Sequence, residues 1–462
     1  MTPQQQLEID PASKRHEFST PQTNQRRAQP THKLPFKQED DEASVAGEVR
    51  TVRVALAGCG VVGGGLVRLL HESSDAIAGR FGVRFELTRV LVRDVRRERN
   101  LPLESRLYTS DLNEFLAHDA EVVVEAVGGQ EPARTIAYSA LKRGKKVITA
   151  NKELVASYGD TLSALANENE TGLDFGAAVG GSAPVISTLR DLIGTTTPRS
   201  VRGILNGTSN FVITQLERGG SLEAALVAAR ERGLAEADCT RDLDGSDAAA
   251  KLAIVAWIAF GISPSSLRVR RTPLIPGLES LVRFASLESA RVRLIAECTQ
   301  LSGHRVATTV EPVIVDSQSV FGRTILEENR VEVDLGWSSP LSVSGPGAGG
   351  RPTAAALLSD LVRVSPPPND RGAGLTQFVS VLDPREHRWL VTTTADTAVL
   401  RQVASASDLP VERFITDADR AALITTPISF VSLQRLTESL ECQNAVPCVA
   451  RYEAGTATEV LQ

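Results

Sequence analysis

The feature that most constrains the fold is an apolar strand that runs directly into a glycine-rich turn and then a helix. Residues 52–57 are rich in β-branched and small apolar side chains, and the positions after the turn have helical spacing. The turn consists of Gly58, Cys59, Gly60, Val61, Val62 and Gly63. Gly58 permits a tight turn, Gly60 lets a pyrophosphate approach the backbone, and Gly63 allows close helix–strand packing. The pattern predicts a dinucleotide site at a helix N-terminus.

Further strands and helices alternate along the chain after this unit. Strand-like runs occur at 85–92, 122–127 and 146–149, and helical patterns occur around 112–116 and 132–143. Near-continuous apolar strands that alternate with helices are typical of a parallel sheet covered on both faces. We therefore predict an α/β chain with a Rossmann-like dinucleotide-binding domain at 51–180, completed by about 341–364.

Two more domains are predicted beyond residue 180. At 181–340, longer helices joined by polar loops indicate an α+β domain that supplies the substrate site. Three consecutive prolines at 366–368 mark a linker, and 372–462 contains five short strand-like runs and two helical stretches, which predicts a small α+β module. Residues 1–49 are rich in Gln, Pro, Thr and charge without apolar periodicity, so we expect a flexible tail.

Composition excludes several classes of partner. The net charge of -6 argues against nucleic acid, because its backbone needs a dominant basic surface. No run approaches the ~18 apolar residues of a membrane helix. Five scattered cysteines without a C-x-x-C pair indicate reduced thiols, and the N-terminus lacks an apolar signal segment. We expect a cytoplasmic protein that binds a small molecule, with no nucleic-acid or membrane partner.

The residues after the second strand bear on the choice of coenzyme. An acidic residue there would bind the ribose hydroxyls of NAD, whereas an arginine would neutralise the 2′-phosphate of NADP. Arg93 and Asp94 both stand at this point, so either coenzyme is open. Arg93 comes first and is followed by more bases at 96, 97 and 99, which favours NADP; solvated surface charge is the alternative.

A carboxylate and an amine stand four residues apart in the predicted helix at 247–260. Asp247 and Lys251 therefore project from one helix face. An amine beside a carboxylate can hand a proton to a carbonyl oxygen as it becomes an alkoxide. The alternative is a surface ion pair of a few tenths of a kcal/mol. Four further acids nearby favour a catalytic site over a surface ion pair: Glu236, Asp238, Asp242 and Asp244.

Such a cluster of like charges becomes useful when the ligand brings a cation. An amino-acid substrate brings an ammonium group, which Glu236 and Asp242 could hold while Lys251 acts at the other end of the molecule. The asparagine-glycine turn at Asn206 is open to two interpretations, a wall of this site or a tight structural turn.

Taken in order, several segments closely resemble the homoserine dehydrogenase family. They are VVEAVGG at 123–129, TANK at 149–152, AAVGG at 177–181 (at the end of a further predicted strand), GILNGTSN at 203–210, GLAEAD at 233–238, DLDGSD at 242–247 with Lys251, and GAGGRPT at 347–353. The resemblance runs from about 52 to 362, and its most family-specific part is 233–251.

The resemblance implies NAD(P)H-dependent reduction of L-aspartate 4-semialdehyde to L-homoserine by a homodimer or homotetramer that assembles through the second domain. It implies that Lys251 is the proton donor and Asp247 its orienting partner. The substrate-binding residues would be Glu236, Asp242, Lys152, Asn206 and Thr208. The coenzyme-binding residues would be Gly58, Gly60, Val61, Val62, Gly63, Arg93, Val127, Gly128, Lys152, Gly233 and Gly349.

The sequence departs from the family around the pocket. Gly176 stands where the family has a glutamate that helps to hold a sodium ion, which leaves as ligands the backbone carbonyls of Val179, Gly181 and Ala183. Cys239 replaces a proline, and Ser182 stands where the family has glycine. Two alternatives therefore stay open: a related dehydrogenase for another amino-acid aldehyde or alcohol, and a non-catalytic regulator that binds nucleotide and amino acid.

The segment after about residue 372 resembles an ACT domain, a βαββαβ module that binds amino acids and regulates biosynthetic enzymes. The turn before its first predicted helix, 396–400, lacks the glycine that would let a ligand approach the backbone. The divergence leaves two roles open, feedback regulation by threonine and a purely structural or oligomerising role.

Overall fold

The computed structural model describes residues 49–453 except 195, 236–237, 337–338, 348, 366–378, 382 and 418–419. Almost all of the predicted tail and most of the predicted linker therefore lie outside the described residues. All five cysteines are described and are free thiols, as expected. None of the described helices is long and apolar enough to cross a membrane.

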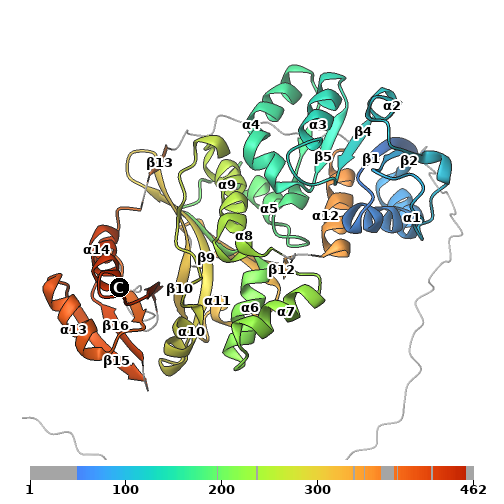
Figure 1. The fold of residues 1–462 in the computed structure, drawn as a ribbon. Coiled ribbons are helices and arrows are strands. Elements are labelled where there is room, and N and C mark those ends of the chain that lie inside the picture. The colour runs from blue at the N-terminus through green and yellow to red at the C-terminus, as the bar shows by residue number, and fades with distance from the viewer. Residues whose placement is uncertain are drawn as a thin grey trace, which may run out of the picture. The chain divides into compact units, whose positions relative to one another are not determined.

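The first domain is the predicted Rossmann-like α/β unit (Figure 1). Its elements are β1 (Arg50–Ala57), α1 (Val61–Phe81), β2 (Val83–Leu91), β3 (Tyr108–Thr109), α2 (Leu112–Ala117), β4 (Val122–Glu125), α3 (Ala133–Lys142), β5 (Lys146–Thr149), α4 (Lys152–Glu168) and β6 (Leu173–Asp174). The described strands pair in parallel in the order β3-β2-β1-β4-β5-β6. Alternate residues of β1 lie in two different apolar clusters, so both faces of the sheet are covered.

The C-terminal boundary of this domain differs from the predicted one. Helix α12 (Gly350–Arg363) packs beside α1, and Ala354 and Leu357 share a core cluster with β1 (Figure 1). Strand β12 (Leu341–Pro346) instead pairs antiparallel with β11 (Glu328–Asp334) in a second sheet. Only α12 therefore completes the nucleotide domain. The AAVGG segment does not end a strand either, because β6 ends at Asp174 and a 3-10 turn, η2 (Gly176–Ala178), follows.

The second domain is built on a β-sheet. The sequence predicted mainly helices in this region and did not identify the individual strands. Its elements are α5 (Val185–Ile193), β7 (Ser200–Ile204), α6 (Gly207–Glu217), α7 (Leu222–Glu231), α8 (Thr240–Leu243), α9 (Ser246–Phe260), β8 (Arg270–Arg271), α10 (Leu278–Leu287), β9 (Ala290–Leu301), β10 (Arg305–Asp316), α11 (Val320–Arg323), β11 (Glu328–Asp334) and β12. The long β9–β10 hairpin is its centre, and residues of α6, α9 and α10 share its apolar cluster.

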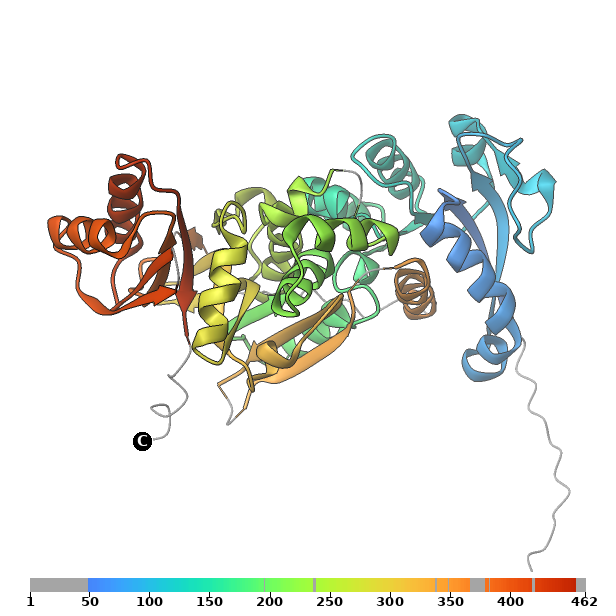
Figure 2. The same cartoon turned by 60° about the horizontal axis from the view of Figure 1, so that its bottom comes forward.

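The C-terminal module, drawn in red in Figure 2, has the element order βαββαβ. It contains β14 (Trp389–Thr393), α13 (Thr397–Ala406), β15 (Val411–Asp417), β16 (Arg420–Thr425), α14 (Phe430–Glu441) and β17 (Pro447–Tyr452), and β13 (Val379–Val381) precedes it. Its strands pair in the order β17-β14-β16-β15. The element order βαββαβ is the one named above for an ACT domain, and both the ACT-like identity and the regulatory role of this module stay predictions.

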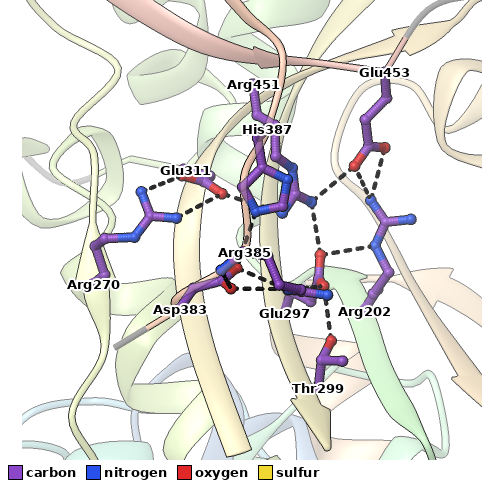
Figure 3. A network of polar contacts seen from close by, with 10 residues as sticks. All are labelled: Arg202, Arg270, Glu297, Thr299, Glu311, Asp383, Arg385, His387, Arg451 and Glu453. Carbon is purple, nitrogen blue, oxygen red and sulfur yellow. Dashed lines mark hydrogen bonds and ion pairs between the residues drawn. The ribbon is translucent and has the colours of Figure 1, made fainter. Parts of the chain in front are cut away.

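Strand β17 joins this module to the second domain, because it pairs in parallel with β10 in one continuous sheet. A buried ionic network covers the junction, with four carboxylates and four guanidinium groups in contact (Figure 3). At its centre the Arg451 guanidinium lies 2.7 Å from Oε2 of Glu297 and 3.3 Å from Oε1 of Glu311. Burial would raise the pKa of Glu297, but Arg451, Arg202 and Arg385 hold it well below its ordinary value.

The network predicts a large cost for removing one of its cations. Arg451→Met should lower the free energy of unfolding by about 3–5 kcal/mol, because two buried carboxylates each lose one of their cationic partners. Arg84→Met, which removes an exposed ion pair with Asp75, should cost less than ~1 kcal/mol. Urea unfolding of both variants at neutral pH measures the difference. If both variants lost less than ~1 kcal/mol of unfolding free energy, Arg451 would not be needed to balance the buried carboxylates of the junction.

Candidate active site

The glycine turn after β1 leaves the N-terminus of α1 open. Gly58 has φ +92°, and a Cβ there would lie 2.5 Å from the carbonyl oxygen of Ala126. No side chain caps α1, whose N-cap is Gly60, and a Cβ at Gly60 would meet no described atom within 4 Å. Val61, the first helical residue, is exposed. The first-turn N–H groups of α1 therefore stand at an uncapped end with space for a phosphate group.

Other predicted coenzyme residues fall into two places. Val127 and Gly128 follow β4, whose neighbour β1 leads into the glycine turn, and Gly128 has φ +79° with open space at its Cβ position. Gly349 precedes α12, whose first residue, Gly350, approaches Val61. Gly233 follows α7 in the second domain, where its N–H donates to the Arg230 carbonyl oxygen at 2.9 Å and so closes the end of that helix.

Arg93 and Asp94 both lie exposed just after β2. The Asp94 side chain is engaged locally, since its Oδ1 accepts the backbone N–H of Arg96 at 2.8 Å. Arg99 donates to the Asp94 carbonyl oxygen at 2.9 Å, which further fixes this turn. The Asp94 carboxylate is thus oriented towards its own turn.

The structure brings Asp247, Lys251 and Lys152 together. Asp247 and Lys251 lie one turn apart on α9, with the Lys251 Nζ 2.8 Å from Oδ2 of Asp247. Lys152 is the first residue of α4 in the nucleotide domain, and its Nζ lies 3.2 Å from Oδ1 of Asp247. The Asp247 side chain is only 9% exposed, so this is no surface ion pair. One carboxylate is shared by ammonium groups from two domains.

Asn206 links this group to a second acid. Its Nδ2 donates to Oδ1 of Asp242 and to Oδ2 of Asp247, both at 2.7 Å, and its Oδ1 caps α6 through the Ser209 N–H. Thr208 is a structural contact, because its hydroxyl donates to the Leu234 carbonyl oxygen. Glu236, the other predicted substrate carboxylate, lies outside the described residues.

The two carboxylates of the site have opposite pKa shifts. Burial would raise the pKa of Asp247, but Lys251 and Lys152 hold it well below its ordinary range. Burial raises the pKa of Asp242, with the hydrogen bond from Asn206 opposing the shift and the nearby Asp247 charge adding to it. The Asp247 carboxylate therefore stays ionised beside Lys251.

Sequence reasoning missed several groups here. The Leu205 carbonyl oxygen accepts from Lys251 Nζ at 2.8 Å, and no sequence signal marks a backbone acceptor. Glu125 was predicted without a role, inside a strand and the VVEAVGG segment, although an acid in an otherwise apolar strand was a usable signal. Its carboxylate is fully buried at the end of β4, where it accepts from Thr149 and two backbone N–H groups.

Comparisons with known proteins identify relatives of this chain. The model "Homoserine dehydrogenase, NAD binding domain" matches residues 58–175, and the model "Homoserine dehydrogenase" matches 184–362. Homoserine dehydrogenase of Mycobacterium tuberculosis is 36% identical over 322 residues, which cover 68% of this chain and 73% of that protein. The Bacillus subtilis enzyme is 32% identical over 318 residues, with coverage of 68% and 73%.

The chain belongs to the homoserine dehydrogenase family. A solved homoserine dehydrogenase from Thiobacillus denitrificans matches with a TM-score of 0.78 at 27% identity, covering 87% of this chain and 98% of that one. A hyperthermophilic archaeal homoserine dehydrogenase in complex with NADPH shares the fold, with a TM-score of 0.58, 22% identity and coverage of 68% and 98%. This chain is thus an oxidoreductase of that family with a nicotinamide coenzyme and a small-molecule substrate.

The described residues give no support to the sodium site that the resemblance implies in homoserine dehydrogenases. The Ala183 carbonyl oxygen already accepts the Val185 N–H at 2.8 Å. A Cβ at Gly176 would lie 2.4 Å from Oδ1 of Asp360, so the Asp360 carboxylate of α12 occupies the space of a side chain there. No three His, Cys, Asp or Glu side chains of the described chain gather to hold a metal ion. No step is therefore assigned to a cation.

We expect the Asp360 carboxyl group to make the free energy of unfolding depend on pH. Burial, together with the Asp174 charge, raises the pKa of Asp360 to about 7. The folded state then binds the proton more tightly than the unfolded state, so the stabilisation is complete below pH ~4 and is lost as pH rises towards 7. Asp360→Asn should remove this loss of stability at high pH. The free energy of unfolding at pH 8 should then exceed that of the wild type by on the order of 2 kcal/mol.

The melting temperatures of wild type and Asp360→Asn between pH 5 and pH 8 measure this effect. The exposed Asp75→Asn variant is the control, and it should follow the wild-type curve. Parallel curves for wild type and Asp360→Asn would show that the buried Asp360 carboxyl does not titrate in this range.

Proposed function

We propose that the chain interconverts L-aspartate 4-semialdehyde and L-homoserine, with NADP as the preferred coenzyme. The observation that supports this most is the shared Asp247 carboxylate, which joins Lys251 of the second domain to Lys152 of the nucleotide domain. When bound, the nicotinamide supplies or takes up the hydride. The uncapped N-terminus of α1 and the turn at Val127 and Gly128 would hold this coenzyme.

Lys251 is proposed as the proton donor. In reduction its ammonium group gives a proton to the substrate oxygen as that oxygen becomes an alkoxide, and in oxidation the amine takes the proton back. Asp247 and the Leu205 carbonyl oxygen each lie 2.8 Å from Nζ, so they orient the ammonium group. Lys152, on the other side of the carboxylate, would contact the substrate beside the nicotinamide.

The acidic side of the site would bind the amino-acid end of the substrate. Asn206 donates to Oδ1 of Asp242, which orients a half-buried carboxylate towards the site. Burial raises the pKa of Asp242, and an ammonium group beside it would stabilise its ionised form. Glu236 is the second candidate for this contact. The substrate's reacting end would then lie at Lys251.

The preference for NADP rests on Arg93. Its guanidinium is exposed directly after β2, whereas the Asp94 carboxylate is held in its own turn by the Arg96 N–H. A cation at this position suits a 2′-phosphate. The NADPH complex of the archaeal relative supports the same choice.

Lys251→Ala tests the proton donor. The variant should lower kcat for homoserine oxidation by about 10²–10⁴-fold, because the general acid–base group is lost. NADPH affinity should stay within about threefold, since the coenzyme residues are untouched, and the control is the exposed Lys142→Ala on α3. Nicotinamide absorbance gives the rate and fluorescence titration gives the affinity.

Each outcome of this assay has a defined meaning. Unchanged turnover in Lys251→Ala would remove Lys251 from the mechanism. A wild-type chain that oxidises another amino alcohol but not homoserine would be a related dehydrogenase. A wild-type chain that binds NADPH and oxidises nothing would be a regulator.

Arg93→Gln tests the coenzyme preference. The Kd for NADPH should rise about 10–100-fold, because a charge-assisted hydrogen bond is worth roughly 1.5–3 kcal/mol, while the Kd for NADH should not change. Arg80→Gln, at the opposite end of α1, is the matched control. Equal weakening of both coenzymes, or of neither, would exclude Arg93 as the 2′-phosphate ligand.

A further inference from the structure

Glu125 ties together the ends of two neighbouring strands. It is the last residue of β4 and is fully buried. Its Oε1 accepts the backbone N–H groups of Val127 at 2.7 Å and Gly128 at 3.3 Å. Its Oε2 accepts the hydroxyl of Thr149, the last residue of β5, at 2.5 Å. One side chain therefore holds the turn after β4 and the end of β5.

The hydrogen bonds continue from Thr149 to the start of α4. The Thr149 Oγ1 accepts the backbone N–H of Asn151 at 2.9 Å. The Asn151 Nδ2 donates back to the Gly129 carbonyl oxygen at 2.6 Å, and its Oδ1 caps α4 through two N–H groups at 3.1 Å. Asn151 thus caps the helix and also contacts the turn that Glu125 holds.

The helix that this ring of contacts fixes begins with Lys152. The Lys152 Nζ lies 3.2 Å from Asp247, which is also the partner of Lys251. Any shift of the α4 N-terminus relative to the turn after β4 would therefore move Lys152 at the proposed reaction centre.

The backbone of the turn fits this arrangement. Gly128 and Gly129 have φ values of +79° and +70°, a conformation that glycine adopts without strain. A Cβ at either glycine would meet no described atom within 4 Å, so one side of the turn faces open space while the N–H of Gly128 faces Glu125. This edge is where the carboxyl ends of parallel strands place ligands in doubly wound folds.

We propose that Glu125, acting through Thr149 and Asn151, is a positioning residue for the dehydrogenase reaction. It holds the turn at Val127–Gly129 against the N-terminus of α4 and so sets the position of Lys152 relative to the nicotinamide site. The inference rests on the proposed function, because it assigns Glu125 to that reaction. A carboxylate suits the role, since its two oxygens can accept from three donors at once.

Three substitutions separate positioning from support of the fold. Thr149→Val removes the hydroxyl between Glu125 and Asn151, and Thr149→Ser keeps it. Asn151→Ser keeps a good helix cap but is too short to reach the Gly129 carbonyl oxygen. Thr135→Val, at an exposed position on α3, is the control for the threonine change.

Thr149→Val and Asn151→Ser should lower kcat for homoserine oxidation about 10–100-fold, because a shift of about 1 Å in a positioned group costs up to ~10²-fold in rate. NADPH affinity should stay within about threefold, and Asn151→Ser should keep the wild-type melting temperature. Thr149→Ser should restore kcat to within about threefold of wild type. Unchanged kcat in both Thr149→Val and Asn151→Ser, or equal losses in Thr149→Val and Thr149→Ser, would overturn the proposal.

Amide hydrogen exchange of the peptide that spans 125–130 gives a readout independent of turnover. Exchange at the Val127 and Gly128 amides should rise at least tenfold in Glu125→Met, because the side-chain oxygen that accepts both N–H groups is lost. Wild-type exchange in that variant would overturn the role of Glu125 even when homoserine is turned over. A wild-type chain without homoserine oxidation would overturn the proposed function, and with it the assignment of Glu125 to that reaction, even if exchange at the turn changes as expected.

Discussion

The buried carboxylate of Asp247 is the interaction on which the candidate site depends. A buried acid is costly unless ions and hydrogen bonds satisfy it, and here Lys251, Lys152 and Asn206 do so. The acid comes from α9 of the second domain, whereas Lys152 begins α4 of the nucleotide domain. Its charge therefore fixes two ammonium groups from different domains at one place, and loss of either would leave a partly compensated buried acid.

The parts of this site that the sequence predicted are those with local causes. Gly58 needs a positive φ within a strand–turn–helix unit, and the four-residue spacing of Asp247 and Lys251 places them on one helix face, so both could be predicted without tertiary structure. Asn206 was open to two interpretations, because its partners stand 36 and 41 residues away. The Leu205 carbonyl oxygen has no sequence signature at all.

The fold was predicted least well where charges lie inside strands. The region of β9 and β10 was predicted as helices and polar loops, and charged residues such as Arg293, Glu297 and Glu311 interrupt its apolar pattern. These residues are buried because their partners come from distant segments; Arg451, for example, is 154 residues from Glu297. The position of the Asp360 carboxylate in the space beside Gly176 is likewise visible only once α12 packs on η2.

Strand β7 connects the buried network to the reaction centre. Arg202 on β7 pairs in register with Glu297 on β9, and its guanidinium contacts both Glu297 and Glu453. A slip of one residue would turn Arg202 to the other face of the sheet, into the apolar cluster. The cost of an unpaired buried charge, several kcal/mol, therefore fixes the register of β7. Leu205 follows β7 directly and its carbonyl oxygen accepts from Lys251, so the strand whose register these ion pairs fix also carries a backbone contact of the proposed proton donor.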